Sequence, residues 1–274
     1  MYYRHNLDYK YPEKCDEHMI EVKHIRDTNF DENYPYLEKG FWAKVKRGLF
    51  FLALNLLAIP ACKIRHGVRY FGLKNIRKNK KMFKNGAITV SNHVFMWDFV
   101  CVSRAISPKL TSFPAWKTNF EGPSGSLIRW AGGIPIPDHS IKAMKSFNGA
   151  LREVLESDRW LHFFPEGSMW YYYPDIRPLK KTVFRLAVHY NKPVIPMAFS
   201  FRPRKGIWKI FSKNPFVDLH IAEPIMPDKT IPEHLAIEKL HKEVYDKMQQ
   251  MCGITPDMPN YNTDQSIENY QKTM

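Results

Sequence analysis

The segment SNHVFMWD places a histidine, His93, five residues ahead of an aspartate, Asp98, directly after a short apolar run. A carboxylate that is hydrogen-bonded to one ring nitrogen of a histidine fixes the tautomer, orients the ring and favours the imidazolium form. The second ring nitrogen is then free to take a proton from an alcohol. We therefore interpret this pair as a candidate general base and its orienting carboxylate. The alternative is that Asp98 only caps a helix and that His93 is an ordinary residue at the end of a strand.

The spacing alone is weak evidence, and the chain contains its own control. His241 and Asp246 have the same separation, but they lie inside a predicted helix, where five steps leave the two side chains roughly 140° apart around the axis. Around His93 a strand is expected to end and a helix to begin near Asp98. The intervening residues can therefore form a turn that returns the carboxylate to the imidazole.

A second polar cluster, in the segment FPEGS, follows the apolar run WLHFF. On physical grounds Glu166 could hydrogen-bond a hydroxyl of a polyol, and the backbone N–H groups near Gly167 could bind an oxyanion. The alternative is an ordinary Pro-Glu-Gly turn. If the strands before the two clusters are parallel neighbours, both clusters emerge at the same edge of the sheet.

The elements that would position these clusters alternate along the chain. Apolar runs predict strands over 87–93, 110–116, 160–166, 193–201 and 216–222, and amphipathic stretches predict helices over 98–106, 140–156, 180–190 and 232–251. This alternation is typical of an α/β fold, and it predicts a mixed, mostly parallel sheet flanked by helices. In such sheets the working residues gather beyond the carboxyl ends of the strands.

The two clusters together resemble the signatures of the lysophospholipid acyltransferases, the glycerolipid acyltransferase superfamily that includes the 1-acylglycerol-3-phosphate acyltransferases. The resemblance extends over roughly residues 70–225. Within this range GGIPIPD (132–138) and KPVIPMAF (192–199) stand where the family has a glycine-led strand and an apolar strand around a proline. Four blocks in the same order are much more specific than any one of them.

The resemblance implies that His93 is the general base that deprotonates an acceptor hydroxyl and that Asp98 orients it. The substrate-binding residues that it implies, or that could serve in their place, are Asn92, Lys117, Glu166, Gly167, Ser168, Lys180 and Lys181. The hydroxyl would attack the thioester of an acyl-CoA or an acyl-carrier protein directly, with no covalent acyl-enzyme. We expect no cofactor beyond this co-substrate, and we expect no metal, because the four scattered cysteines show no metal-ligand spacing.

Two departures from the family pattern affect the prediction of the acceptor. Asp138 stands where the family usually has an arginine thought to contact the phosphate of the acceptor, and Ser168-Met169 replace a Thr-Arg pair. Lys117 matches a lysine that is common in the family, and Lys180 and Lys181 lie close enough to the FPEG loop to substitute. The acceptor is therefore expected to be a lysophospholipid such as 1-acylglycerol-3-phosphate, or one with a larger or less anionic head group.

A membrane-associating segment is predicted over residues 41–66. Its apolar stretch (48–62) contains Asn55 and the breaker Pro60, and it is shorter than the ~20 residues of a spanning helix. Basic residues flank the stretch, so we expect an amphipathic helical segment that lies in the interface, with a peripheral or monotopic protein at the cytoplasmic face. The alternative is a buried core helix.

The remaining boundaries follow from composition. We expect a polar leader (residues 1–40, called the leader below), an acyltransferase domain (67–252) and a C-terminal tail (253–274). The aromatic run Trp170–Tyr173 is expected either to dip into lipid head groups or to pack in the core.

The net charge of +14 favours an anionic partner, and the alternative is a soluble basic protein with no dedicated anionic partner. Membrane lipids and acyl-CoA or an acidic acyl-carrier protein fit this charge, whereas no recognised nucleic-acid-binding module occurs, so nucleic acid is not expected. A lipid-binding scaffold that has lost catalysis remains an alternative, because the arginines of the family are missing.

Overall fold

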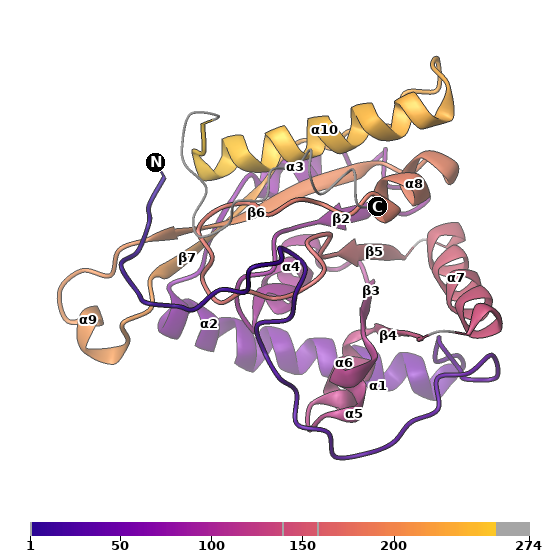
Figure 1. Cartoon of the computed structure of the whole chain (residues 1–274), viewed down its shortest axis with the longest axis horizontal. Coiled ribbons are helices and arrows are strands. Elements are labelled where there is room, and N and C mark those ends of the chain that lie inside the picture. The colour runs from indigo at the N-terminus through magenta and orange to yellow at the C-terminus, as the bar shows by residue number, and fades with distance from the viewer. Residues whose placement is uncertain (1, 139, 158, 256–274) are drawn as a thin grey trace.

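The computed structural model describes residues 2–138, 140–157 and 159–255. The predicted C-terminal tail lies outside the described residues except for its first three positions. The strands form one seven-stranded sheet in the order β1-β7-β6-β2-β5-β3-β4 (Figure 1). They are β1 (Arg69–Phe71), β2 (Ile88–Val90), β3 (Thr111–Trp116), β4 (Gly133–Ile136), β5 (Trp160–Phe163), β6 (Val194–Arg202) and β7 (Phe216–Ile221).

The helices connect these strands and cover both faces of the sheet. They are α1 (Phe41–Ala53), α2 (Ile59–His66), α3 (Leu73–Lys78), α4 (Asp98–Ile106), α5 (Lys117–Glu121), α6 (Gly125–Ala131), α7 (Ile141–Glu156), α8 (Thr182–His189), α9 (Trp208–Phe211) and α10 (Glu233–Cys252), with a π-helical segment η1 (Leu54–Ala58) between α1 and α2.

Neighbouring strands pair in parallel except for β6 and β7, which are antiparallel. The predicted mixed, mostly parallel sheet flanked by helices is therefore confirmed. Because β2, β5, β3 and β4 are consecutive and parallel, their carboxyl ends meet at one edge of the sheet. We call this edge the catalytic edge, since the two polar clusters follow β2 and β5.

Alternate residues of β6 divide the core between the two faces of the sheet. Val194 and Ala198 belong to the cluster that packs against α7, α8 and α10. Ile195, Met197 and Phe199 belong to the cluster that packs against α2 and α4. Figure 1 shows α10 and α2 on opposite sides of the sheet. A strand with both faces buried is what the continuous apolar run of this segment predicts.

Residues Phe41–His66 form one continuous helix of 26 residues, built from α1, η1 and α2. By length and composition alone it could cross a membrane, and only 11% of its apolar window is buried. The alternative of a buried core helix is therefore wrong. The prediction that Pro60 breaks the segment is also wrong. The N–H of Ile59 bonds to the carbonyl of Leu54 in the wide π turn, and Pro60 follows directly at the start of α2, so the helix continues through the proline.

The described part of the leader, residues 2–40, contains no helix or strand and runs across the molecule to the start of α1 (Figure 1). It contacts residues that lie far along the chain. Its hydrogen bonds include Tyr2 with Asp175, Tyr9 with Asn214, Tyr11 with Tyr171, Cys15 with Arg177 and Glu17 with Trp170. Its later residues Phe30 and Tyr36 are buried.

The aromatic run after the FPEGS segment lies inside the protein. Trp170, Tyr172 and Tyr173 are buried, and Tyr11 of the leader stacks on Trp170 with a ring-centroid distance of 5.6 Å. The option that this run dips into lipid head groups is therefore wrong. Residues of the leader pack over this aromatic run, and the sequence around the run does not indicate this contact.

Candidate active site

The turn between β2 and α4 brings Asp98 back to His93. Nδ1 of His93 lies 2.5 Å from Oδ2 of Asp98. The aspartate side chain is 2% exposed, whereas that of the histidine is 25% exposed. Oδ2 also accepts the backbone N–H of Val94 at 3.2 Å, which fixes the carboxylate in the turn. His241 and Asp246, the pair with the same spacing, bind other groups, as expected. A ring nitrogen of His241 lies 2.9 Å from the carbonyl of Leu179, and Asp246 pairs with Lys242.

The contacts of the imidazole leave one nitrogen for chemistry. Because Nδ1 faces the carboxylate, it carries the proton, and Nε2 keeps its lone pair. Within the described residues no protein group hydrogen-bonds Nε2. Phe164 stacks on the ring at a centroid distance of 3.9 Å, with the planes 14° apart. The imidazole is therefore held in one orientation with a basic nitrogen at the catalytic edge.

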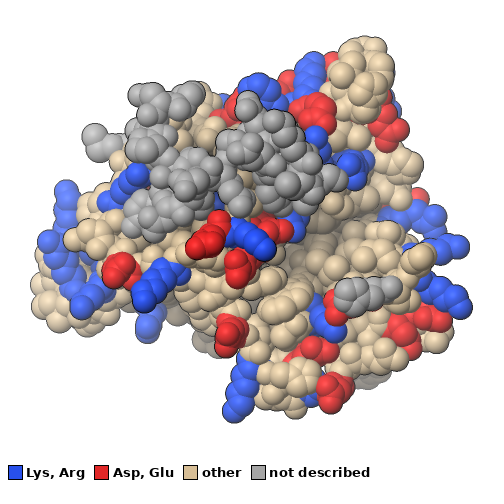
Figure 2. All heavy atoms as spheres, viewed as in Figure 1, with Lys and Arg blue, Asp and Glu red and all other residues tan. Residues whose placement is uncertain are grey.

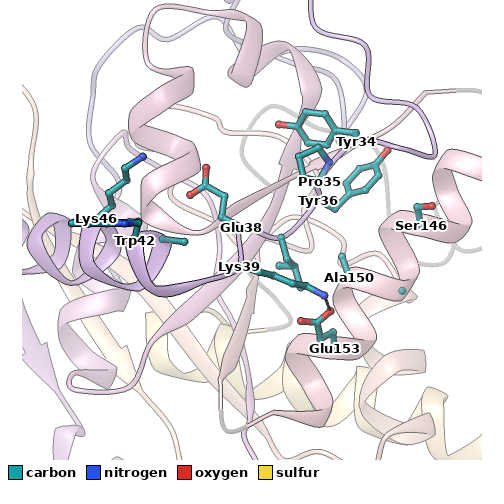
Figure 3. Close-up of a pocket in the computed structure, with 13 residues that line it drawn as sticks. Tyr34, Pro35, Tyr36, Glu38, Lys39, Trp42, Lys46, Ser146, Ala150 and Glu153 are labelled. Atoms are coloured by element: carbon teal, nitrogen blue, oxygen red, sulfur yellow. Dashed lines mark ion pairs between the residues drawn. The ribbon is translucent and has the colours of Figure 1, made fainter.

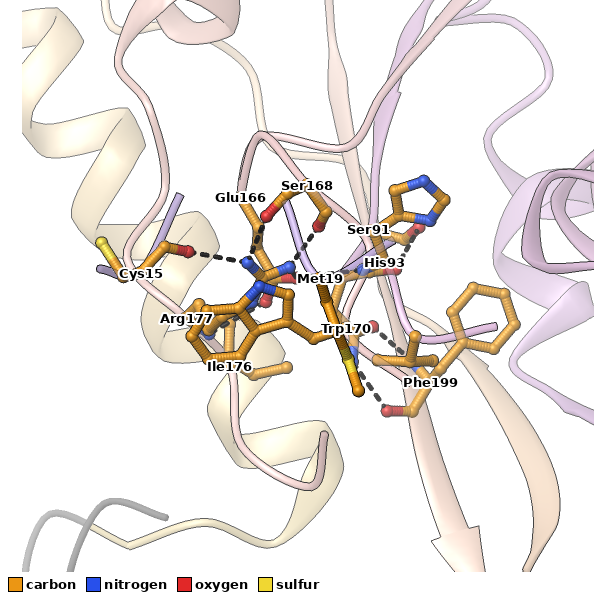
Figure 4. Close-up of polar contacts among 12 residues, drawn as sticks. Cys15, Met19, Ser91, His93, Glu166, Ser168, Trp170, Ile176, Arg177 and Phe199 are labelled. Carbon is orange, nitrogen blue, oxygen red and sulfur yellow. Dashed lines mark hydrogen bonds and ion pairs between the residues drawn. The ribbon is translucent and has the colours of Figure 1, made fainter. Parts of the chain in front are cut away.

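Glu166 lies beneath this turn and holds its backbone. Its side chain is buried, and Oε2 accepts the backbone N–H of His93 at 3.0 Å. Arg177 donates to Oε2 through Nη2 and to Oε1 through its backbone N–H, each at 2.9 Å. Figure 4 shows Glu166 between His93 and Arg177. In this structure both carboxylate oxygens bind protein donors, so the geometry gives Glu166 a positioning role, and its contact with an acceptor stays a prediction.

Arg177 is the residue that the sequence reasoning missed. Its guanidinium is buried, donates through Nη1 to Oγ of Ser168 at 2.9 Å and to the carbonyl of Cys15 at 2.7 Å, and stacks over Trp170 at 4.3 Å. The backbone N–H of Trp170 in turn donates to the carbonyl of His93 at 3.0 Å. Arg177 thus joins the FPEGS turn, the leader and the histidine turn. The sequence offers one signal for such a partner. Glu166 has no lysine or arginine next to it in the chain, and a buried glutamate needs a cation from elsewhere.

The remaining residues of the two turns have structural contacts. The side-chain amide of Asn92 donates to the carbonyl of Phe199 at 3.0 Å and accepts its N–H at 2.7 Å, which fastens the end of β2 to β6. Gly167 has a φ of 87°, and a Cβ there would lie 2.9 Å from Cε of Lys180. Only glycine fits this turn without strain.

The three predicted lysines lie in different places. Lys180 lies beside Gly167 and pairs with Asp16 of the leader at 3.1 Å. Lys117, at the end of β3, pairs with Asp138 after β4 at 2.5 Å, and this hydrogen bond raises the pKa of the lysine. Lys181 instead pairs with Glu238 on α10 at 2.6 Å. The structure therefore brings Lys180, but not Lys181, to the FPEGS turn.

A second histidine, which the sequence reasoning did not single out, lies behind the site. His162 on β5 is buried, with Nδ1 2.9 Å from Oγ1 of Thr89, and its ring lies edge-on to Phe164 at 4.4 Å. Burial is the main cause that lowers the pKa of His162 to about 3, and the nearby ring of His93 acts in the same direction. This imidazole is therefore neutral at physiological pH and supports the stacked ring of Phe164 from behind.

A cavity of about 720 Å³ lies away from these residues, between the leader, α1 and α7. Figure 3 shows Tyr34, Trp42 and the ion pair of Lys39 with Glu153 at its wall. None of the residues that line it belongs to the two polar clusters. The candidate active site is therefore the catalytic edge and not this cavity.

Comparison with known proteins agrees with this geometry. Residues 67–200 match the model of the family described as Acyltransferase, and this range contains the histidine turn, the FPEGS turn and Arg177. The matched range covers just under half of the chain, and within it the chain resembles this acyltransferase family. Among solved structures it is similar to the crystal structure of the 1-acyl-sn-glycerophosphate (LPA) acyltransferase, PlsC, from Thermotoga maritima. The identity is 19%, the TM-score is 0.48, and the match covers 77% of this chain and 96% of that chain.

Proposed function

We propose that the protein transfers a fatty acyl group from an acyl thioester, either acyl-CoA or acyl-carrier protein, to the hydroxyl of a lysophospholipid such as 1-acylglycerol-3-phosphate. The observation that carries this proposal is the bond between Nδ1 of His93 and the buried Asp98, which leaves Nε2 basic at the catalytic edge. The match of residues 67–200 to the Acyltransferase family model supports acyl transfer. The exposed apolar helix Phe41–His66 supports a lipid acceptor and a place at a membrane, for which we propose the cytoplasmic face.

The proposed reaction is a single displacement. Nε2 of His93 takes the proton of the acceptor hydroxyl while its oxygen bonds to the thioester carbonyl carbon. The C–S bond breaks, the imidazolium gives the proton to the leaving thiolate, and His93 ends neutral. Asp98 stabilises the imidazolium that exists between these two proton transfers. Glu166 and Arg177 keep the turn of His93 in place throughout.

The charges at the catalytic edge support an acceptor with a modest negative charge. Lys117 is neutralised by Asp138, and Lys180 is paired with Asp16. A phosphomonoester would have to compete with both carboxylates for these ammonium groups. We therefore propose that the protein prefers lysophospholipids with a larger or less anionic head group over 1-acylglycerol-3-phosphate, whose phosphate Lys180, on a flexible stem beside Gly167, is still close enough to bind.

The test is acyl transfer from radiolabelled acyl-CoA, or acyl-carrier protein, to a panel of lysophospholipids, with products separated by chromatography. We expect His93→Ala to lower the turnover rate by ~10²–10⁴-fold, because a positioned general base is lost. The exposed His189, at the end of α8, provides the control, and His189→Ala should keep full activity. Unchanged acyl transfer by His93→Ala would overturn the mechanism, whereas no transfer by the parent protein would favour a lipid-binding scaffold.

A further inference from the structure

The tip of the β6–β7 hairpin, residues 203–214, exposes an unusual amount of apolar surface. Within the five residues 207–211 the exposed fractions are 67% for Ile207, 41% for Trp208, 84% for Ile210 and 72% for Phe211. This tip carries the short helix α9, which projects from one end of the molecule (Figure 1). Large apolar side chains gathered on a projection mark a surface that binds something.

The same tip is strongly cationic. Lys205, Lys209 and Lys213 are exposed, and none of them has an ion pair with another described residue. No acidic residue occurs between positions 203 and 217. Figure 2 shows lysine and arginine side chains gathered over this end of the molecule. Apolar and aromatic side chains flanked by unpaired cations fit the boundary between the head groups and acyl chains of an anionic bilayer.

The hairpin tip is fixed to the end of the helix Phe41–His66. Nη2 of Arg204 donates to the carbonyl of Arg65 at 2.5 Å, and its Nε donates to the carbonyl of Asn214 at 2.6 Å. Its guanidinium stacks over Phe216 at 4.4 Å, and the same ring would meet a Cβ on Gly67. The tip therefore cannot move independently of the C-terminal end of α2.

The surface of α2 continues the character of the hairpin tip. Ile64 is exposed one residue before Arg65, and Lys63 is exposed beside it. Further along the same helix Leu56 and Leu57 are exposed as well. The helix and the hairpin tip that is joined to it therefore both expose apolar and cationic side chains.

We propose that the hairpin tip is a second membrane-binding element, which inserts Ile207, Ile210 and Phe211 into the same anionic bilayer as the helix Phe41–His66. This rests on the proposed function only in placing the protein at a membrane. Two attachment sites at a fixed separation define the orientation of the domain on the bilayer. A single helix would leave the domain free to rotate about its axis.

The test is co-sedimentation of the full chain with vesicles of phosphatidylcholine and phosphatidylglycerol. Ile210→Asp/Phe211→Asp should lower the vesicle partition coefficient about tenfold or more, because two apolar side chains no longer insert. Lys205→Gln/Lys209→Gln should lower it about fivefold per charge removed, and only when phosphatidylglycerol is present. Leu235→Asp, an equally drastic change at an exposed position of α10, is the matched control and should leave partition unchanged.

Undiminished partition of both hairpin variants would overturn the proposal. So would a change from dimer to monomer in Ile210→Asp/Phe211→Asp, seen by light scattering, because the surface would then bind a second copy of the chain. Acyl transfer to a detergent-dispersed lysophospholipid separates this inference from the proposed function. Both variants should keep that activity, since the catalytic edge is untouched. If Ile210→Asp/Phe211→Asp does not fold, Lys205→Gln/Lys209→Gln still tests the proposal.

Discussion

The backbone of His93 is held in place by a buried ion pair, which Glu166 and Arg177 form. Glu166 bonds the backbone N–H of His93, and Arg177 neutralises Glu166. Both side chains are fully buried, so each charge is stable there only because the other is present. The pair therefore connects the folding of the FPEGS turn to the geometry of the base.

We expect Arg177→Met to lower the free energy of unfolding by about 3–5 kcal/mol, because Glu166 would remain as an uncompensated buried charge. The double variant Glu166→Gln/Arg177→Met removes both charges and should be more stable than Arg177→Met alone. Urea denaturation of the four proteins of this cycle measures the coupling. Arg185→Met, at an exposed arginine on α8, should change stability little. Equal and additive losses in the two single variants would contradict a coupled pair.

The buried imidazole of His162 predicts a dependence of stability on pH. Its pKa in the folded protein is about 3, against about 6.5 for a free histidine. Below pH 6.5 the imidazole of His162 therefore binds a proton in the unfolded chain but not in the folded protein. The contribution of this residue to stability is complete above pH 6.5 and falls by about 1.4 kcal/mol per pH unit as the pH drops towards 3.

In His162→Gln the difference in unfolding free energy between pH 7.5 and pH 5.0 should be smaller than in the parent by about 2 kcal/mol. Urea denaturation at the two pH values measures this difference. His189→Gln, which changes an exposed histidine, should keep the pH dependence of the parent. An unaltered pH dependence in His162→Gln would show that the pKa of His162 is the same in the folded protein and in the unfolded chain.

At this scale the sequence predicted residues whose partners are close along the chain and missed those whose partners are distant. The pairing of His93 with Asp98 was predictable, because a strand end and a helix start fix the turn between them. Arg177 and His162 were not, because nothing local marks the first as the partner of Glu166 or the second as the support of Phe164. The roles of Asn92 and Ser168 in binding substrate stay predictions.

At the scale of elements, residue patterning predicted the main strands and helices, including the exposed helix Phe41–His66, but not several of the short elements. Runs of β-branched and aromatic residues predicted β2, β3, β5, β6 and β7, and helical periodicity predicted α4, α7, α8 and α10. The strand β4 matches the glycine-led block of the family resemblance. The three-residue β1 and the four-residue α9 are too short to show a period. Their formation depends on neighbours that are distant in sequence.

The helix Phe41–His66 carries the most direct prediction at this scale. Leu56 and Leu57 lie in its middle and are 64% and 71% exposed. We expect Leu56→Asp/Leu57→Asp to lower partition onto phosphatidylglycerol vesicles about tenfold or more. Co-sedimentation measures the effect, and an unchanged denaturation midpoint should accompany it. Partition equal to that of the parent would mean that this face of the helix does not bind lipid.

Substitution is a sharper test here than deletion of residues 41–62. Ile59 and Cys62 are buried against the domain, and Arg47 donates to the carbonyl of Thr111 at the start of β3. A deletion would therefore damage the fold as well as the surface. The helix lies along the domain on one side and exposes leucine on the other, which supports a monotopic arrangement.

At the scale of the whole molecule, the leader determines much of what the sequence could not reveal. It covers Trp170, bonds Arg177 and pairs with Lys180, so it lies against the candidate active site. Its polar composition and lack of periodicity predicted only an extended path. Which surface it follows depends on contacts between residues more than a hundred positions apart, and single-sequence patterns do not report these.

These long contacts have a consequence for biosynthesis. The carbonyl of Cys15 finds its partner Arg177 162 residues later in the chain. At a translation rate of about 5–20 residues per second, Cys15 is added to the chain roughly 8 to 30 seconds before that arginine. The apolar helix Phe41–His66 emerges within this interval, so a nascent chain can meet lipid while its base is still unassembled. The candidate active site is therefore completed only after most of the polypeptide has been synthesised.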